Sequence, residues 1–319
     1  MSDISISSDG RDAPSEFNEK AAVGEAGGAS TFWIANHLFL RDPVVLATRA
    51  LSQTERMSVA LMAVSPLTLH PVQIAMAAAT LDEAFPGRVK LCLGVGAPAD
   101  LKALEIDGSR PLRAMREALR IIRALLAGET VNYHGETFTV ASRRLVTERR
   151  PVPLILAASG PQTLKLAGAE ADGVLISAGS SVQFVEQTLK HVDEGTNGRK
   201  VRTHGLVYAA VGESESVAND RLRRILAILL RGPHHRANLD AAGSALDQAA
   251  LNQAVVAEDW DRAQAMITDD IVARHAASGP PARVRERLAA YHAAGLDEVI
   301  VAGARDGDQI RKILRSFKG

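Results

Sequence analysis

The chain has 319 residues, of which 46% are hydrophobic and only 4% aromatic, and its 37 basic side chains balance 37 acidic ones. This length allows two domains or one large α/β barrel, and the zero net charge argues against a nucleic-acid or membrane partner recruited by bulk charge. The single cysteine, Cys92, excludes an internal disulfide and a thiolate metal cluster. The apolar stretches fall short of the ~20 residues that span a membrane, and the N-terminus does not resemble a signal peptide. We therefore expect a cytoplasmic, enzyme-sized globular protein.

Short apolar runs alternate with segments of helical periodicity along the chain. Each run is rich in aliphatic or β-branched residues and is too short for a helix, which is typical of a strand buried on both faces. The predicted strands are residues 4–7, 31–36, 58–64, 89–95, 154–158, 174–177, 205–211 and 298–302. The predicted helices are residues 14–27, 43–53, 70–83, 110–126, 161–171, 182–192, 214–230, 280–295 and 306–317.

Two of these helices carry clear local signals. Asp42 caps the helix at 43–53, and Pro43 opens it. In the helix at 110–126 the apolar residues recur at steps of three and four, while its arginines lie mostly on another face. We expect that arginine-rich face to be a solvated surface, and Gly128 is placed to end the helix.

Two insertions interrupt the alternation. Residues 130–140 predict a small hairpin, and residues 232–277, with Ala, Leu and Gln runs and no strand, predict a helical insertion. Strands that alternate with helices indicate a parallel sheet. Because the strand count is eight and no GxGxxG motif follows the first strand, we predict a (β/α)8 TIM barrel rather than an open doubly wound sheet. We expect residues 1–319 to form one domain.

The stretch 153–181 predicts a strand–helix–strand unit with a Ser/Gly loop after each strand. Ser159 offers a capping hydroxyl, Gly160 a permissive backbone, and Pro161 a first-turn residue whose missing N–H costs nothing. The second loop is residues 177–180. Backbone N–H groups at helix N-termini suit a phosphate or another anion. The repeated pattern favours a ligand, although each loop could also be only a helix start.

Functional groups of such a barrel lie on the loops after the strands, at one rim. This rule brings together Asn36 and His37, residues 62–66, residues 96–100 and the two Ser/Gly loops. His37 could also be a polar residue that merely ends a strand. No metal site is predicted, because the pair His234 and His235 has no third ligand at suitable spacing.

Several motifs occur in an order and spacing that are specific in combination: WIANH…RDP, HP…AAATLDEAFPGRVKLCLGVG, REALRIIRALLAGETVNYHGETF, PLILAASGP and ADGVLISAG. With them the chain resembles the luciferase-like monooxygenase superfamily, particularly its deazaflavin-using branch. The similarity covers residues 31–211 and resumes at 279–303. The resemblance implies a TIM barrel that holds a flavin or a deazaflavin, and a homodimer or a higher homo-oligomer.

The resemblance also implies roles for single residues. His37 matches a histidine beside the reactive face of the ring, and Asn36 stands where many deazaflavin members have Asp. The peptide bond between Met62 and Ala63 matches a bulge whose non-prolyl cis bond presses on the back of the ring. The residues that match stretches holding the ribityl chain and the phosphate are Gly96, Ala97, Ala158, Ser159, Gly160, Pro161, Ser177, Ala178, Gly179 and Ser180.

The resemblance restricts the substrate only in part. Ala99 occupies the place of a Glu that donates a proton in the sugar-phosphate dehydrogenase subgroup, and the adjacent Asp100 need not replace it, so a sugar phosphate is not supported. The substrate lining is expected from the 232–277 insertion and from Phe39, Leu40, Leu67, Thr68 and Asp100.

Three classes of function remain open. The first is an oxidoreductase in which coenzyme F420 carries a hydride to or from a small organic substrate, with His37 as the proton-transfer residue. The second keeps the fold but uses reduced FMN and oxygen, as a monooxygenase served by a separate flavin reductase. The third is a flavin-binding protein without turnover. An isomerase or aldolase barrel lacks support, because no lysine is placed at a strand end.

Overall fold

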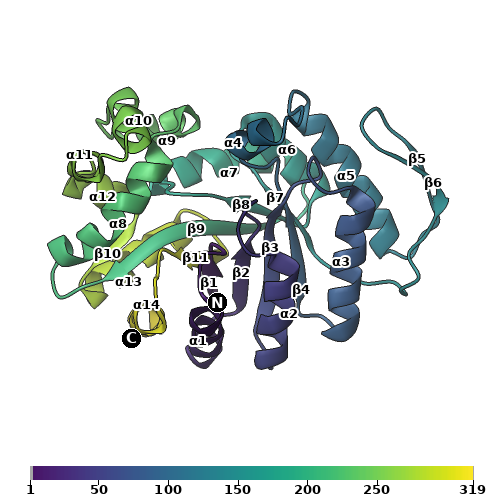
Figure 1. Cartoon of the computed structure of the whole chain (residues 1–319), viewed down its shortest axis with the longest axis horizontal. Helices are drawn as coiled ribbons and strands as arrows, with labels where there is room; N and C mark the ends of the chain where they lie inside the picture. The colour runs from purple at the N-terminus through teal and green to yellow at the C-terminus, as the bar shows by residue number, and fades with distance from the viewer. Residues whose placement is uncertain (1–2, 319) are drawn as a thin grey trace.

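A closed barrel of eight parallel strands is the centre of the fold, as predicted (Figure 1). The structure is a computed structural model that describes residues 3–318. Strand β9 pairs with both β8 and β11, which joins the two ends of the sheet into a barrel. The barrel strands, in order around it, are β1 (Asp3–Ser8), β2 (Thr31–Ala35), β3 (Ser58–Val64), β4 (Val89–Leu93), β7 (Leu154–Ala157), β8 (Gly173–Ile176), β9 (Arg202–Val211) and β11 (Glu298–Ala302).

Helices follow the strands and cover the outside of the barrel. They are α1 (Pro14–Ala26), α2 (Pro43–Gln53), α3 (Pro71–Ala84), α4 (Pro98–Ala103), α5 (Pro111–Leu126), α6 (Pro161–Glu170), α7 (Val182–Thr196), α8 (Glu215–Leu230), α13 (Pro281–Ala293) and α14 (Gly307–Lys318). Seven of the α-helices in the described part of the chain begin at a proline, whose fixed φ suits the first turn. Asp42 caps α2 through the backbone N–H groups of Val44 and Val45, as predicted.

The two predicted insertions are present at opposite ends of the molecule (Figure 1). The hairpin consists of β5 (Val131–His134) and β6 (Thr139–Arg143). The helical insertion consists of a 3-10 turn, η1 (Pro233–His235), followed by α9 (Arg236–Ala242), α10 (Gln248–Val256), α11 (Trp260–Ala265) and α12 (Asp269–His275). A short strand that the sequence did not indicate, β10 (Ala277–Gly279), begins at residue 277, where the predicted insertion ends. It pairs with the end of β9.

Apolar side chains fill the barrel itself as a separate cluster inside the ring of strands. Its buried members are Trp33, Ala35, Ala60, Met62, Cys92, Ile155, Leu175 and Ile300. Cys92 is fully buried there, and burial raises the pKa of its thiol, so it is an unreactive core residue as expected. A larger cluster lies between the strands and the surrounding helices, and a third one holds α8 to the insertion.

A buried polar group closes the N-terminal end of the barrel. Glu298, 0% exposed, accepts hydrogen bonds from Trp33 Nε1 at 2.8 Å and from the Ser5 hydroxyl. Its other oxygen lies 3.0 Å from His204 Nδ1 and 3.7 Å from Lys90 Nζ. Burial alone raises the pKa of this carboxyl, but the His204 hydrogen bond and the Lys90 charge hold it well below its ordinary value. Glu298 therefore joins four other strands at their starts.

Local predictions for two helices need correction. Residues 98–103 form the helix α4, where a loop was expected, because Pro98 opens a turn within the 96–100 segment. Gly160 is the N-cap of α6, and no side chain caps it, so the capping role expected of Ser159 is wrong. The arginine face of α5 is exposed as expected, but its arginines form ion pairs with Glu136, Glu170 and Asp172 rather than facing only solvent.

Candidate functional site

The loops after β2, β3 and β4 form a small pocket at the C-terminal rim of the barrel. Its lining consists of Asn36, Leu38, Ala63, Ser65, Thr68, Gly96, Ala97, Asp100 and Leu101. Six of the predicted site residues are brought together here, namely Asn36, Ala63, Thr68, Gly96, Ala97 and Asp100. Ser65 lies within the 62–66 stretch that the strand-end rule selected, whereas Leu38 and Leu101 are additions.

Backbone contacts fix this part of the rim. The Asn36 N–H donates to the Met62 carbonyl at 2.6 Å, and the Ser65 hydroxyl donates to the Val95 carbonyl at 2.7 Å. The cis peptide bond predicted between Met62 and Ala63 is present, and a second one joins Ser177 to Ala178. The loops of neighbouring strands are thus tied to each other before any ligand is considered.

Two glycines allow this close approach. A Cβ on Gly94 would lie 2.7 Å from the Cβ of Ala63, which is too short for any real contact. Gly96 has φ +98°, a conformation that favours glycine, and a Cβ there would lie 3.3 Å from the Ser65 hydroxyl. The glycines therefore shape the pocket and do more than relieve packing between a strand and a helix.

His37 follows β2 at the same rim, and its side chain is exposed. Partial burial of the ring lowers its pKa below the ordinary value, Asp9 and Asp100 oppose this shift, and Arg11 adds to it. The ring is therefore largely neutral at pH 7, in the form that can accept a proton. The expected substrate residues Phe39 and Leu40 follow after Leu38 and are exposed, with Phe39 at φ +65°.

Charged residues after β1 belong to this rim as well. Asp9 and Arg11 form an ion pair at 2.8 Å and both act on the pKa of His37, and the Arg41 guanidinium donates to the carbonyls of Gly10 and Arg11. The strand-end rule that selected the other loops would have found this pair, had it been applied to the first strand.

The two Ser/Gly loops differ in exposure. Ser159, Gly160 and Pro161 are exposed, and a Cβ on Gly160 would meet no atom within 4 Å, so the α6 N-terminus is open to a ligand. In the loop after β8, Ser177 and Ala178 are half-buried, whereas Gly179 and Ser180 are buried beneath the insertion. Only the first half of the second loop therefore faces the rim directly.

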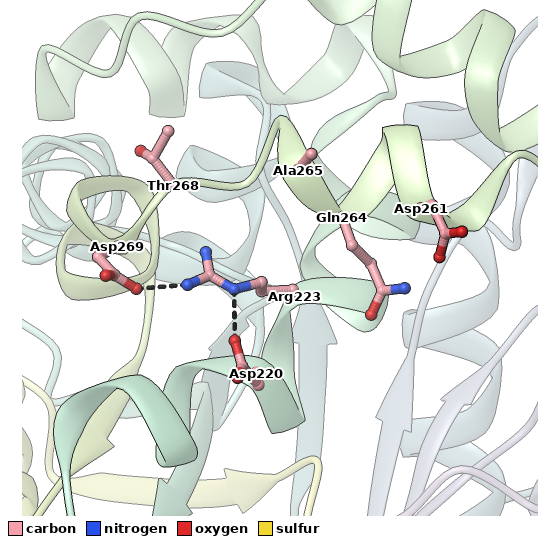
Figure 2. Close-up of a pocket in the computed structure, with 7 residues that line it drawn as sticks. All are labelled: Asp220, Arg223, Asp261, Gln264, Ala265, Thr268 and Asp269. Atoms are coloured by element: carbon pink, nitrogen blue, oxygen red, sulfur yellow. Dashed lines mark hydrogen bonds and ion pairs between the residues drawn. The ribbon is translucent and has the colours of Figure 1, made fainter.

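A larger surface hollow lies away from the rim, between α8, α11 and α12 (Figure 2). Arg223 is its central side chain, and its guanidinium pairs with Asp220 at 2.8 Å and with Asp269 at 2.5 Å (Figure 2). The same guanidinium also donates to the Ile267 carbonyl. These partners already neutralise the charge, so the hollow is a structural feature of the insertion and not the candidate site.

Metal binding and membrane insertion find no support within residues 3–318. No group of three or more His, Cys, Asp or Glu side chains is arranged to hold a metal ion, and His234 and His235 face each other at 4.4 Å between ring centres. None of the helices in this range is long and apolar enough to cross a membrane.

Comparison with known proteins identifies the family of the chain. Residues 3–298 match the family described as luciferase-like monooxygenase, and the chain belongs to this family. A 5,10-methylenetetrahydromethanopterin reductase of Archaeoglobus fulgidus is 29% identical over 304 residues, covering 92% of this chain and 90% of that protein. An F420-dependent glucose-6-phosphate dehydrogenase of Beutenbergia cavernae is 32% identical over 191 residues, or 56% of each chain. The protein is accordingly an oxidoreductase of this family.

Solved structures show the same fold. The coenzyme F420-dependent tetrahydromethanopterin reductase of Methanopyrus kandleri superposes with a TM-score of 0.91 at 22% identity, covering 99% of this chain and 98% of that one. An F420-dependent secondary alcohol dehydrogenase in complex with an F420–acetone adduct gives a TM-score of 0.83 at 17% identity, covering 100% and 99%. At these identities the likeness establishes the fold only.

Proposed function

We propose that the protein is an F420-dependent oxidoreductase that transfers a hydride between bound coenzyme F420 and a small organic substrate. The observation that supports the proposal is the rim pocket, which brings together Asn36, Ala63, Gly96 and Ala97, four of the residues expected to hold the coenzyme. When bound, F420 supplies the hydride-accepting or hydride-donating ring. The chain's own residues bind and orient that ring and handle the accompanying proton.

The rim suits a planar ring joined to an anionic tail. Beneath it, the barrel presents the small apolar side chains of Ala35, Ala63 and Ala157, together with Met62, as an apolar floor against which a ring could pack. Across the mouth, the exposed N-terminus of α6 carries no side-chain cap, so its N–H groups are free for a phosphate. His37 follows β2 at the same rim and is assigned to move the proton.

The substrate is expected to differ from a sugar phosphate, because Ala99 replaces the expected glutamate. Of the residues expected to contact the substrate, the polar side chains Thr68 and Asp100 belong to the pocket lining. We also expect the enzyme to work as a homodimer or a higher homo-oligomer, which analytical ultracentrifugation would measure.

The deciding experiment is a titration of the purified protein with F420 and, separately, with FMN, followed by the fluorescence and visible absorbance of each. We expect saturable binding of F420 at least tenfold tighter than that of FMN, equal to ~1.4 kcal/mol or more. Tighter binding of FMN would reject the F420 assignment in favour of an FMN-dependent monooxygenase served by a flavin reductase. Absence of binding by both would reject the proposed coenzyme-dependent hydride transfer as a whole.

A further inference from the structure

Side chains from outside the barrel hold the loop after β8 by its backbone. The Gly179 carbonyl oxygen accepts two hydrogen bonds, from Asn238 Nδ2 at 2.8 Å and from His275 Nδ1 at 2.9 Å. The Ser181 N–H donates to Asn238 Oδ1 at 2.8 Å. Asn238 therefore makes both an amide donor and an amide acceptor contact with the same loop.

A third side chain reaches the loop from another helix. The Tyr291 hydroxyl, on α13, donates to the Ser180 carbonyl at 2.8 Å. Asn238, His275 and Tyr291 are each no more than 1% exposed. A buried polar side chain destabilises the fold unless its hydrogen bonds are made, so three of them directed at consecutive backbone groups form a specific arrangement.

The protonation of these groups is set for donation. His275 Nε2 lies 2.8 Å from the Ser244 hydroxyl, which leaves Nδ1 to carry the proton that Gly179 accepts. Burial lowers the pKa of His275 to about 4, and burial raises the pKa of Tyr291 to about 12. Both side chains keep these roles across the pH range in which an enzyme works.

The contacts determine which way the peptide groups of the loop point. In a planar trans peptide, the N–H points opposite to the carbonyl. Because the Gly179 carbonyl points into the insertion, the Ser180 N–H points away from it, on the opposite side of the loop. The negative end of that peptide dipole is thereby kept away from the rim, where Ser177 and Ala178 are half-exposed.

We propose that Asn238, His275 and Tyr291 are positioning residues that hold the loop after β8 in the conformation that receives the anionic tail of the coenzyme. This inference rests on the proposed function. It assigns the helical insertion, from which Asn238 and His275 come, to the coenzyme site in addition to the substrate lining expected from the sequence. The three residues act through the loop and are not themselves placed in contact with coenzyme or substrate.

Two conservative variants test the proposal. Asn238→Asp keeps an oxygen for the Ser181 N–H but places a second oxygen against the Gly179 carbonyl. Tyr291→Phe removes only the hydroxyl and keeps the ring packed, so it is expected to fold even if Asn238→Asp does not. We expect the coenzyme Kd to rise at least tenfold in Asn238→Asp and about three- to tenfold in Tyr291→Phe, with kcat at saturating coenzyme within about threefold of wild type.

The matched control is Gln248→Glu in the same insertion. Gln248 Nε2 donates to the carbonyls of Leu230 and Gly232, each at 2.7 Å, at the end of α8 rather than to the loop. Because the side chains of Leu229 and Leu230 lie near Gly179, this control separates a disturbance of the neighbouring helix from loss of the hydrogen bonds to the loop. Like Asn238→Asp, Gln248→Glu replaces an amide N–H donor that faces backbone carbonyls with a carboxylate oxygen. It should lower the midpoint of thermal unfolding while leaving the coenzyme Kd within twofold of wild type.

Hydrogen–deuterium exchange of the peptide that contains residues 177–185, measured without coenzyme, gives a second readout. Faster exchange there in Tyr291→Phe, but not in Gln248→Glu, supports the proposal. This inference is overturned, and the proposed function left standing, if both test variants fold and bind the coenzyme as tightly as wild type does. If Asn238→Asp does not fold, wild-type affinity in Tyr291→Phe alone overturns it. If the wild-type protein binds neither F420 nor FMN, both this inference and the proposed function are overturned. If it prefers FMN, only the choice of F420 is overturned, and the affinities of the variants are then compared with FMN as the coenzyme.

Discussion

At the scale of single residues, the rim combines a few polar groups with backbone shaped by glycine. Gly94 and Gly96 let neighbouring loops approach, and His37 presents an imidazole whose pKa is lowered mainly by burial. An interaction that strengthens only in the transition state affects turnover, whereas loops that contact the bound coenzyme affect its binding. Two substitutions separate these contributions.

Replacing His37 by Ala is expected to lower kcat/KM by ~10²–10⁴ while the coenzyme Kd stays within about threefold, because a proton-transfer group acts on the barrier more than on binding. In the direction that oxidises the substrate, His37 must be neutral to accept a proton. With a pKa below the ordinary ~6.5, wild-type activity should fall only below that pH, and the variant should lack this limb. Steady-state kinetics from pH 5 to 8 measure both effects.

His134→Ala is the control for this experiment, because His134 is an exposed histidine on the hairpin. It should behave as wild type. Normal turnover by His37→Ala would show that His37 has only a structural role. Loss of coenzyme binding by this variant would make His37 a binding residue, and Asp100 would then be the first candidate for the proton donor.

Gly160→Val tests the exposed phosphate loop. Gly160 has φ −86°, which any residue adopts, and the surrounding space is open, so the fold should tolerate the valine. Its side chain would occupy the approach to the α6 N-terminus, and we expect coenzyme affinity to fall at least tenfold, or ~1.4 kcal/mol. Fluorescence titration measures the affinity, and thermal unfolding confirms the fold. Unchanged affinity would remove this loop from the site.

At the scale of elements, one buried carboxylate attaches the hairpin to the barrel. Glu117, on α5, is 6% exposed and accepts the backbone N–H groups of Glu136, Thr137 and Phe138 at 2.9–3.0 Å. A Cβ on Gly135 would lie 2.3 Å from this carboxylate, so the turn needs a glycine at that point. The hairpin strands pair mainly with each other and bury Val131 and Val140 in the core, and Glu117 supplies a polar link from their turn to a helix.

Glu117→Ala is expected to lower the free energy of unfolding by about 2–3 kcal/mol, since hydrogen bonds to a charged acceptor are strong and their donors would lose a buried partner. Hydrogen–deuterium exchange should become faster first within residues 131–143, and urea unfolding measures the total loss of unfolding free energy. Arg113→Ala, which removes only an exposed ion pair with Glu136, should cost no more than ~1 kcal/mol. Equal effects of the two variants would contradict the assigned role of Glu117.

At the scale of the whole molecule, buried neutral histidines make stability depend on pH. Burial lowers the pKa values of both His235 and His275 to about 4, while each is ~6.5 in an unfolded chain. Burial also lowers the pKa of His204. The unfolded chain therefore binds more protons below pH ~6.5, so this stabilisation is complete above that pH and is lost as the pH falls toward 4.

Urea unfolding at pH 7.5 and pH 5.0 should show a clear loss of unfolding free energy at the lower pH, with each such histidine contributing up to ~1.4 kcal/mol per pH unit. Glu298 does not contribute in this window, because its lowered pKa matters only below the ~4.3 of an unfolded glutamate. His275→Gln should reduce the slope. A free energy of unfolding that is constant between the two pH values would contradict the assignment of neutral buried histidines.

The barrel and its order of elements could be predicted from the sequence, because both rest on local signals. Apolar runs of strand length, prolines at helix starts and Asp42 before Pro43 act within a few residues of the chain. The rim followed from the rule that strand ends converge, and it located Asn36, Ala63, Gly96 and Asp100 correctly in one pocket. The family motifs supplied the expected roles.

Only the tertiary structure could decide which polar side chains meet across the fold. Glu298 is the first residue of a strand in the sequence, yet its carboxylate receives the indole N–H of Trp33 from 265 residues away. The Gly179 carbonyl is bound by His275 across 96 residues, and nothing near Gly179 indicates that the insertion would cover it. Periodicity and capping depend on neighbours in the chain, whereas a buried hydrogen bond depends on which elements the closed barrel and its insertion bring into contact.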